Sequence, residues 1–366
     1  MPKRGENIRK RKDGRWEARI LTEKGKYKSI YAKSYYTLKS KISNEKNGIS
    51  EHKQQLSVTI SFEQLCSEWI KEKEIKNKQS TIARYTEIIK KHILPYFENM
   101  NIEKIERNHI NAFVRFKTYQ GNLNAKTVQD ITCVLIQILK YAEKQSYIKE
   151  HSYDISRPQT TIKELEILTS QEQKILINYI KREINQENIG ILLSLYTGLR
   201  LGEVCALQWQ DIDIHEGIIY ITKTMQRIST NDNTEKYKTK VIIDTPKSQK
   251  SHRRIPIPDF LLLELKKLSK QCSQKAYILT GSESKYTEPR TYQYKFKKYL
   301  KNAGIRDINY HALRHTFATR AVEQNIDIKT LSEILGHSTV SFTLDRYVHP
   351  SISLKKHNME KLAVCY

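Results

Sequence analysis

The chain has 366 residues, enough for two or three domains that each bury a core of their own. Its 64 lysines and arginines against 40 aspartates and glutamates give a net charge of +24, which indicates a polyanionic partner, although a lysine-rich protein from an AT-rich genome would explain part of it. The five cysteines lack metal-site spacing, no apolar run approaches about 18 residues and no hydrophobic signal core is present, so we expect a cytoplasmic protein without disulfides, zinc or membrane contact.

Residues 1–55 are strongly basic, with 16 lysines and arginines against 6 acids. Lys12-Asp13-Gly14-Arg15 predicts a tight hairpin turn, because Asp-Gly tolerates the positive φ that such turns demand. After the turn, charged and apolar side chains alternate up to Ile20, which predicts a strand with one charged and one apolar face. A further strand at 27–32 and a helix at 37–47 would cover the apolar face.

A small three-stranded sheet with a basic outer face fits the major groove of duplex DNA. We therefore expect this unit to bind DNA, with four candidate contact residues: Lys12, Arg15, Arg19 and Lys28. The alternative is a basic appendage that binds DNA without sequence preference.

The next unit, 58–155, is expected to be all helical. Ser61-Phe-Glu-Gln64 predicts a capping box that opens its first helix. Three more helices are expected at 81–93, ending before Pro95, at 108–119 and at 127–144. The last of these places apolar residues three and four apart, which predicts a core-facing stripe. Polar segments at 54–59 and 156–164 are expected to be linkers.

The remaining unit, 165–366, is expected to be mostly helical with one small sheet. A capping box at Ser170-Gln-Glu-Gln173 would open its first helix. Two strands at 241–247 and 253–258 are expected to lie around a turn at 248–252. The other expected elements are helices at 189–196, 201–208, 259–269, 288–303 and 311–324, and a short strand at 217–222.

Five motifs in this unit combine a nucleophile with the cations that phosphoryl transfer needs. A tyrosine attacks phosphorus only after losing a proton whose pKa is about 10. Two arginines can neutralise the phosphate oxygens, and a lysine or histidine can protonate the leaving 5′-oxygen, so no metal or other cofactor is required. The motifs are Tyr196-Thr-Gly-Leu-Arg200-Leu-Gly-Glu203, Thr245-Pro-Lys247-Ser, His311-Ala-Leu-Arg314-His315, Leu335-Gly-His337 and Tyr347.

These motifs, in this order, resemble those of the tyrosine recombinases, or phage integrase family, over about 165–349. The resemblance implies an α+β multidomain fold: a three-stranded β domain for arm sites (1–55), an all-helical core-binding domain (58–155) and a mostly helical catalytic domain with a small antiparallel sheet (165–366). It implies a site-specific recombinase that integrates or excises a mobile element through a 3′-phosphotyrosine, similar to conjugative-transposon and lambda-type integrases.

The resemblance also implies roles for single residues. Arg200 and Arg314 would hold the phosphate, and His337 would donate to one of its oxygens. His311 would accept the tyrosine's proton or bond to it, whereas His315, turned away by about 100°, would pack or orient. Glu203 would orient Arg200, because a carboxylate beside the phosphate would repel it. A metal site at His-x-x-Arg-His is disfavoured, since no acid occupies the required place.

Two assignments have rivals in the sequence. The resemblance places the lysine in a hairpin before an Arg-x-Ile-Pro strand, which selects Lys247 from a group that also holds Lys240, Lys250, Arg253 and Arg254. The nucleophile is Tyr347, ten residues after His337, and its nearest competitors are Tyr310 and Tyr366.

The expected partner is double-stranded DNA at core and arm sites, bound by four protomers. An excisionase and a DNA-bending protein are candidate partners. The apolar residues of the tail, 351–366, would dock either on a neighbouring protomer or on the same subunit. Two other functions stay open: a catalytically silent DNA-binding regulator, and a type IB topoisomerase, against which the separate N-terminal unit argues.

Overall fold

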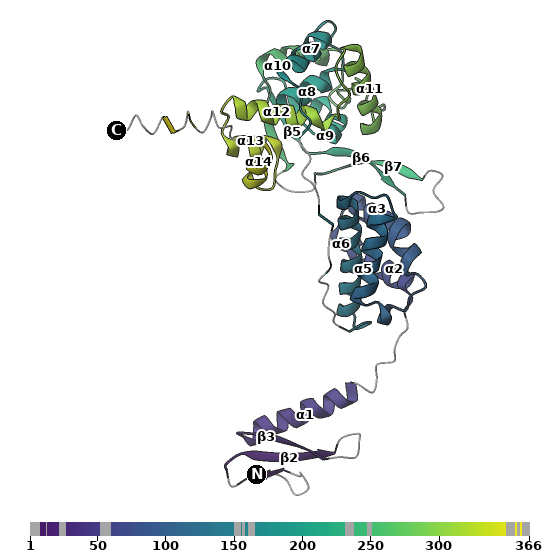
Figure 1. Cartoon of the computed structure of the whole chain (residues 1–366). Helices are drawn as coiled ribbons and strands as arrows, with labels where there is room; N and C mark the ends of the chain where they lie inside the picture. The colour runs from purple at the N-terminus through teal and green to yellow at the C-terminus, as the bar shows by residue number, and fades with distance from the viewer. Residues whose placement is uncertain are drawn as a thin grey trace.

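The structure is a computed structural model of the whole chain. It describes residues 8–11, 13–21, 27–51, 60–149, 155, 158–159, 165–230, 238–246, 251–348, 356 and 359–360. Within these ranges no helix has both the length and the apolar character that crossing a membrane requires. The N-terminal sheet, a helical body and the part that follows residue 165 succeed one another along the chain (Figure 1).

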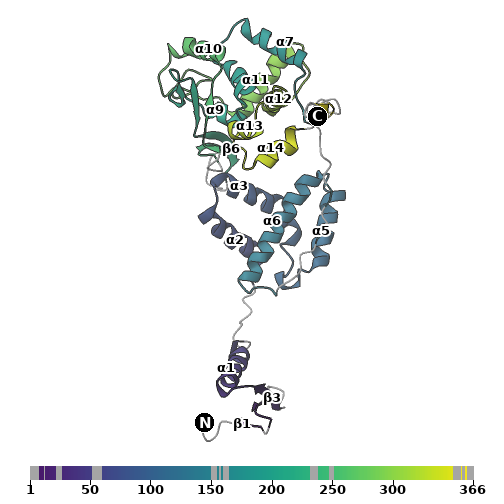
Figure 2. The ribbon, with the colours of Figure 1, turned by 90° about the vertical axis from the view of Figure 1, so that its left-hand side faces the viewer.

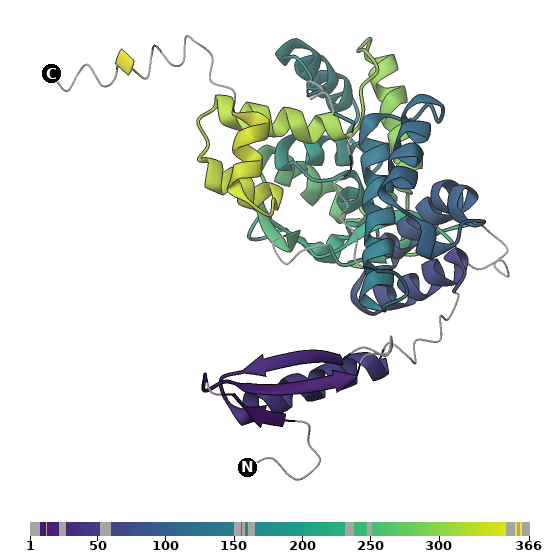
Figure 3. The ribbon, with the colours of Figure 1, turned by 60° about the horizontal axis from the view of Figure 1, so that its bottom comes forward.

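The N-terminal part is a three-stranded antiparallel sheet in the order β1 (Ile8–Lys10), β2 (Trp16–Leu21), β3 (Tyr27–Ala32), followed by α1 (Tyr35–Glu51). Gly14 has φ +83° in the predicted turn between β1 and β2. One face of the sheet packs on α1 through buried Ala18, Ile30 and Leu38. The view in Figure 3 shows α1 lying along this face. The predicted sheet is confirmed, and the helix is longer than expected.

The helical body is built around its longest helix, α6, whose predicted apolar stripe is buried. The capping box at Ser61 is present, since Gln64 N donates to Ser61 Oγ at 3.1 Å and Ser61 N donates to Gln64 Oε1 at 3.0 Å. The elements are α2 (Phe62–Lys76), α3 (Gln79–Ile88), a π-helical turn (Ile89–Ile93), α4 (Leu94–Phe97), a 3₁₀ turn (Ile102–Lys104), α5 (Arg107–Tyr119) and α6 (Ala125–Lys144).

The expectation that a helix ends before Pro95 is wrong. The chain continues from α3 through the π-helical turn Ile89–Ile93 into α4, where Pro95 occupies the first turn. Proline has no N–H, and in a regular helix its ring would clash with the carbonyl four residues before it. The wider π turn accommodates the ring, so the helix passes through the proline instead of stopping.

The part that follows residue 165 is mostly helical with small antiparallel sheets, which confirms the expected fold class, but its strands form two sheets where one was expected. One sheet has the order β4 (Ile212–Asp213), β5 (Ile218–Ile221), β8 (Arg253–Pro256), and the other pairs β6 (Thr224–Ser229) with β7 (Thr239–Asp244). The helices are α7 (Ser170–Lys181), α8 (Ile189–Thr197), α9 (Leu201–Ala206), a 3₁₀ turn (Trp209–Asp211), α10 (Asp259–Ser269), α11 (Pro289–Asn302), α12 (His311–Glu323), α13 (Ile328–Leu335) and α14 (Val340–Tyr347).

Two local expectations for this part are corrected. The capping box of α7 lies one residue earlier, at Thr169 and Glu172, where a glutamate accepts from the cap nitrogen and also favours the positive end of the helix. Strands β7 and β8 do not form a hairpin with each other. Each pairs with an earlier strand, β7 with β6 and β8 with β5, and β6 was not anticipated.

The helical body contacts the third part where α3 lies beneath β6 (Figure 2). Lys78, the N-cap of α3, donates from Nζ to Thr245 Oγ1 at 2.7 Å and pairs with Asp244 at 3.2 Å. This contact joins the two bodies directly beside the Thr245-Pro-Lys247 motif.

Candidate active site

The corner between α8 and α9 places Arg200. Helix α8 ends at Gly198, whose φ of +67° lies in the left-handed region that glycine adopts without strain. A Cβ there would lie 2.6 Å from the Phe317 ring and 2.9 Å from Leu335. The glycine therefore allows both the turn and the close approach of α12 and α13, and Arg200 follows as the N-cap of α9.

Glu203 binds two arginines from different segments. Arg200 Nη1 donates to its Oε1 at 2.8 Å, and Arg253 donates to both of its oxygens at 2.9 and 2.7 Å. Burial alone would raise the pKa of the Glu203 carboxyl, but the hydrogen bonds and charges of Arg253 and Arg200 lower it to about 2. The carboxylate is therefore ionised at neutral pH, and it accepts hydrogen bonds from both the backbone nitrogen and Nη1 of Arg200.

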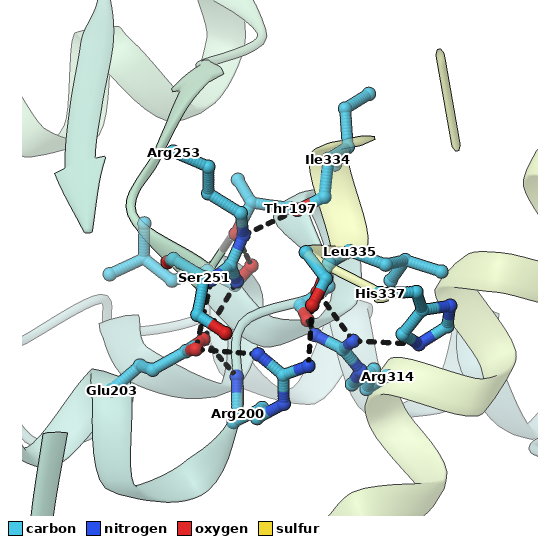
Figure 4. Close-up of polar contacts among 12 residues, drawn as sticks. Thr197, Arg200, Glu203, Ser251, Arg253, Arg314, Ile334, Leu335 and His337 are labelled. Atoms are coloured by element: carbon cyan, nitrogen blue, oxygen red, sulfur yellow. Dashed lines mark hydrogen bonds and ion pairs between the residues drawn. The ribbon is translucent and has the colours of Figure 1, made fainter. Parts of the chain in front are cut away.

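Three arginines bind three successive carbonyl oxygens at the C-terminal end of α13 (Figure 4). Arg253 Nε donates to the Ile334 oxygen at 2.6 Å and Arg314 Nη2 to the Leu335 oxygen at 2.6 Å. The third, Arg200 Nη2, donates to the Gly336 oxygen at 3.2 Å. The last carbonyls of a helix have no partners within it and carry the negative end of its dipole, so cations stabilise them.

Arg314 is the most deeply buried cation of the cluster. Its Nη1 donates to the Gly198 oxygen at 2.7 Å, so it joins the α8–α9 corner to the end of α13. Burial and the charge of Arg200 lower its pKa to about 9, which leaves it positive at neutral pH. Arg314, expected to be the second arginine that holds the phosphate, thus lies in the interior, whereas the side chain of Arg200 is one-third exposed.

Both ring nitrogens of His337 have hydrogen-bond partners. Its Nε2 lies 3.0 Å from Arg314 Nη2 and its Nδ1 lies 2.8 Å from Thr343 Oγ1. Burial and the charge of Arg314 lower the pKa of His337 to about 3, so the ring is neutral. Because a guanidinium only donates, Nε2 accepts from Arg314 and Nδ1 carries the proton. Donation to a phosphate oxygen, its expected role, requires these bonds to change.

Tyr347 lies at the end of α14 and is buried among Ala318, Leu331 and Leu335. Its hydroxyl oxygen is 2.8 Å from Nδ1 of His315. Burial raises the pKa of the Tyr347 phenol, although the charges of Arg314 and Arg346 oppose this effect.

The structure reverses the expected positions of the two histidines on α12. His315, expected to point away, contacts the Tyr347 hydroxyl, and burial together with the His311 ring lowers the pKa of His315 to about 3. His311 lies at the exposed start of the helix, with its ring edge-on to His315 at 4.6 Å. Helix α14 packs against α12 so that the Tyr347 hydroxyl lies beside His315. The i, i+4 spacing of the two histidines places both on one face and was the available signal.

The competing tyrosines do not share this position. Tyr310 is fully enclosed in the core, where its hydroxyl bonds to Ser194 Oγ at 2.8 Å and to the Gly190 oxygen at 2.9 Å. Tyr366 and Lys247 lie outside the described residues, as does most of the tail. Arg253, considered in the sequence only as a rival of Lys247, belongs instead to the Glu203 cluster.

On the N-terminal sheet, Arg15, Arg19 and Lys28 are exposed as expected, and Lys12 lies outside the described residues. Glu17 is buried at the centre of the charged face, where Arg9 Nε donates to it at 2.9 Å. Among the described residues, no group of three or more His, Cys, Asp or Glu could hold a metal ion.

Two family models match the chain: the phage integrase family over residues 166–353, just over half of the chain, and the SAM-like N-terminal domain of phage integrases over 61–118. A XerC-like tyrosine recombinase from Caldanaerobacter subterraneus is 27% identical, covering 92% of this chain and 91% of the relative. The ICEBs1 integrase of Bacillus subtilis is also 27% identical, covering 85% of each chain.

Two solved structures show the same fold. The integrase of transposon Tn1549, solved with transposon right-end DNA, has a TM-score of 0.67 at 20% identity and covers 83% of this chain and all of its own. A lambda integrase dimer on a core site has a TM-score of 0.58 at 17% identity and covers 95% of this chain and 97% of its own. With the family models, these relatives show that the chain belongs to the phage integrase family and is a tyrosine-type site-specific recombinase.

Proposed function

We propose that this chain cuts and rejoins the DNA ends of a mobile element, with Tyr347 as the nucleophile. The observation that carries the proposal is the convergence of Arg200, Arg314, His337 and Tyr347 from four segments of the chain on the end of α13. The Tyr347 oxygen would attack the scissile phosphorus, and the bond from phosphorus to the 5′-oxygen would break. The 3′-phosphotyrosine preserves the bond energy, so the released 5′-hydroxyl of a partner strand can reverse the step without ATP.

The arrangement supports a division of roles. The exposed side of Arg200 would bind the phosphate. Arg314 bonds to the surrounding segments and would add positive charge from the buried side of the site. The neutral ring of His315 can take the phenolic proton, because its Nδ1 already contacts the hydroxyl. We assign the proton for the leaving 5′-oxygen to Lys247, on the motif alone. His311 would act at the same face once Tyr347 leaves its buried position.

DNA would be held by all three parts of the chain. The helical unit (58–155) and the catalytic unit (165–366) would enclose the core site, and residues 1–55 would bind arm sites. Lambda integrase has been solved as a dimer on a core site and as a tetramer on a Holliday junction. We infer four protomers on two duplexes here as well, with an excisionase and a DNA-bending protein as candidate partners.

The test is a nicked suicide substrate, on which a cleaving recombinase remains covalently attached to its DNA. Tyr347→Phe keeps the ring and its packing but loses the attacking oxygen, so it should bind DNA like the wild type and form no covalent complex. Tyr310→Phe is the matched control, because it removes a buried hydroxyl elsewhere in the same part, and it should still attach. Attachment by Tyr347→Phe would move the nucleophile to another tyrosine. A wild-type protein that binds but never attaches would be a silent regulator.

A further inference from the structure

Arg253 bonds to Glu203 and to the end of α13, although none of the five motifs contains it. It begins β8 and its side chain is 5% exposed, which is rare for a charge unless it is fully paired. Its guanidinium is paired: besides both oxygens of Glu203 and the Ile334 oxygen, Nη1 reaches the Ser251 oxygen at 3.2 Å. One side chain therefore connects α9, the chain entering β8 and the end of α13.

The shared carboxylate determines what Arg200 can do. Glu203 lies between Arg200 and Arg253, and each of its oxygens accepts from both residues. With Arg253 present, the negative charge is balanced by a second arginine, whose side chain is 5% exposed. Without it, Arg200 would be the nearest cation to a buried carboxylate and would be held there more tightly. Arg253 thus leaves the Arg200 charge available to a phosphate.

The bond from Arg253 to the Ile334 oxygen connects Arg253 to the end of α13, beside His337. The Ile334 carbonyl lies two residues before Gly336 and three before His337, at the point where α13 ends. Any movement of this carbonyl also moves the Leu335 and Gly336 oxygens, which hold Arg314 and Arg200. The contact between β8 and the end of α13 therefore couples Arg200 and Arg314 to the position of His337.

We propose that Arg253 is a positioning residue of the cleavage step, which acts through Glu203 on Arg200 and through Ile334 on His337. It touches no DNA in this role. The inference rests on the proposed function, because it assigns Arg253 to the phosphate site of the same recombinase.

Three variants test it: Arg253→Gln, Arg253→Lys and the double variant Arg253→Gln/Glu203→Gln. The readouts are the single-turnover cleavage rate on the suicide substrate at saturating protein, the Kd for the same DNA and the Tm. We expect Arg253→Gln to slow cleavage by about 100-fold with an unchanged Kd, since losing a partner of a site residue typically costs about 10- to 100-fold. Arg253→Lys restores the charge but not the three-way geometry, so its rate should be intermediate.

The double variant separates positioning from simple stability. Glu203→Gln removes the carboxylate charge but keeps an amide oxygen that can accept from Arg200, so cleavage should recover by about tenfold over Arg253→Gln even where the Tm does not. Arg254→Gln, next along β8 with its guanidinium over the Tyr220 ring, loses the same charge and should cleave at the wild-type rate. A double variant no faster than Arg253→Gln, or a parallel loss of binding and cleavage, would overturn the proposal. Failure of the wild type to attach to DNA would instead refute the proposed function.

Discussion

Two buried glutamates organise arginines in this molecule, one in the catalytic part and one in the N-terminal sheet. Glu203 and Glu17 are each 2% exposed, and each accepts from an arginine at 2.9 Å or closer. Glu17 lies directly opposite Arg9 and Tyr31 on the neighbouring strands, and its oxygen also contacts Ser29 Oγ at 3.3 Å. The same pairing of a carboxylate with several guanidinium groups thus occurs on two unrelated elements.

The difference between the two clusters lies in how far the arginines are buried. Around Glu203 the side chain of Arg253 is 5% exposed and that of Arg200 33%, whereas Arg9 beside Glu17 is 66% exposed. Buried cations are held in one orientation at low dielectric, which suits charge that develops in a transition state. Exposed cations are screened by salt and can adjust, which suits the recognition of a DNA backbone and base edges. We therefore propose that one arrangement serves chemistry and that the other serves binding.

The largest expected effect comes from the buried cluster. Arg314→Lys keeps the charge but cannot bond the Gly198 and Leu335 oxygens and His337 at once. Cleavage of the suicide substrate should fall by about 100- to 1,000-fold at saturating protein. Arg290→Lys, an exposed arginine beside Tyr294, is the control and should cleave normally. Normal cleavage by Arg314→Lys would show that the planar guanidinium, with its several hydrogen-bond donors, is not needed at this position.

Deleting residues 1–55 tests whether the two clusters work independently. The truncated chain should lose binding to arm sites and retain cleavage of a core substrate, because the catalytic motifs all lie beyond residue 165. The salt dependence of binding to DNA that contains arm sites should also flatten, since fewer counterions are released. Gel-shift titrations at several salt concentrations would measure both. The separation is contradicted if the truncated chain still binds arm-site DNA with the same salt dependence. It is also contradicted if the truncated chain no longer cleaves the core substrate.

Glu17→Gln should change DNA affinity less than the deletion does. The affinities for non-specific DNA and for arm-site DNA should change in different directions. The hydrogen bond from Arg9 lowers the pKa of Glu17, so the carboxylate is charged at neutral pH and removing it makes the face more positive. Non-specific DNA binding should hold or increase, while affinity for the arm site should fall about tenfold as the arginines lose their alignment. Glu51→Gln, at the last residue of α1, removes one negative charge from the same unit and should leave the ratio of the two affinities unchanged. An equal increase in affinity for arm-site DNA and for non-specific DNA would mean that Glu17 acts only through its charge.

The smallest expected effect is that of excess EDTA on the cleavage step. Arg200 and Arg314 are proposed to supply the positive charge that metal ions provide in two-metal nucleases. The single-turnover rate should be the same with EDTA as with magnesium, measured on a purified protein without ATP. A requirement for magnesium in cleavage itself would show that the arginine cluster does not suffice.

Local features of this protein were predictable from the sequence because they depend on neighbouring residues. The Asp13-Gly14 turn, the Ser61 capping box and the apolar stripe of α6 each follow from side chains within a few positions of one another. The motif residues around the end of α13 could be named for the same reason, because their spacing along the chain is itself the signal.

Only the tertiary structure decided which of these features meet. A strand pattern does not specify its partner, so β7 could be recognised as a strand without revealing that β6 lies beside it. The contact of His315 with Tyr347 depends on where α14 packs along α12, and the proposed role of Arg253 depends on the Ile334 carbonyl, 81 positions away. Backbone oxygens carry no residue identity, so no motif could record that three arginines converge on the end of α13.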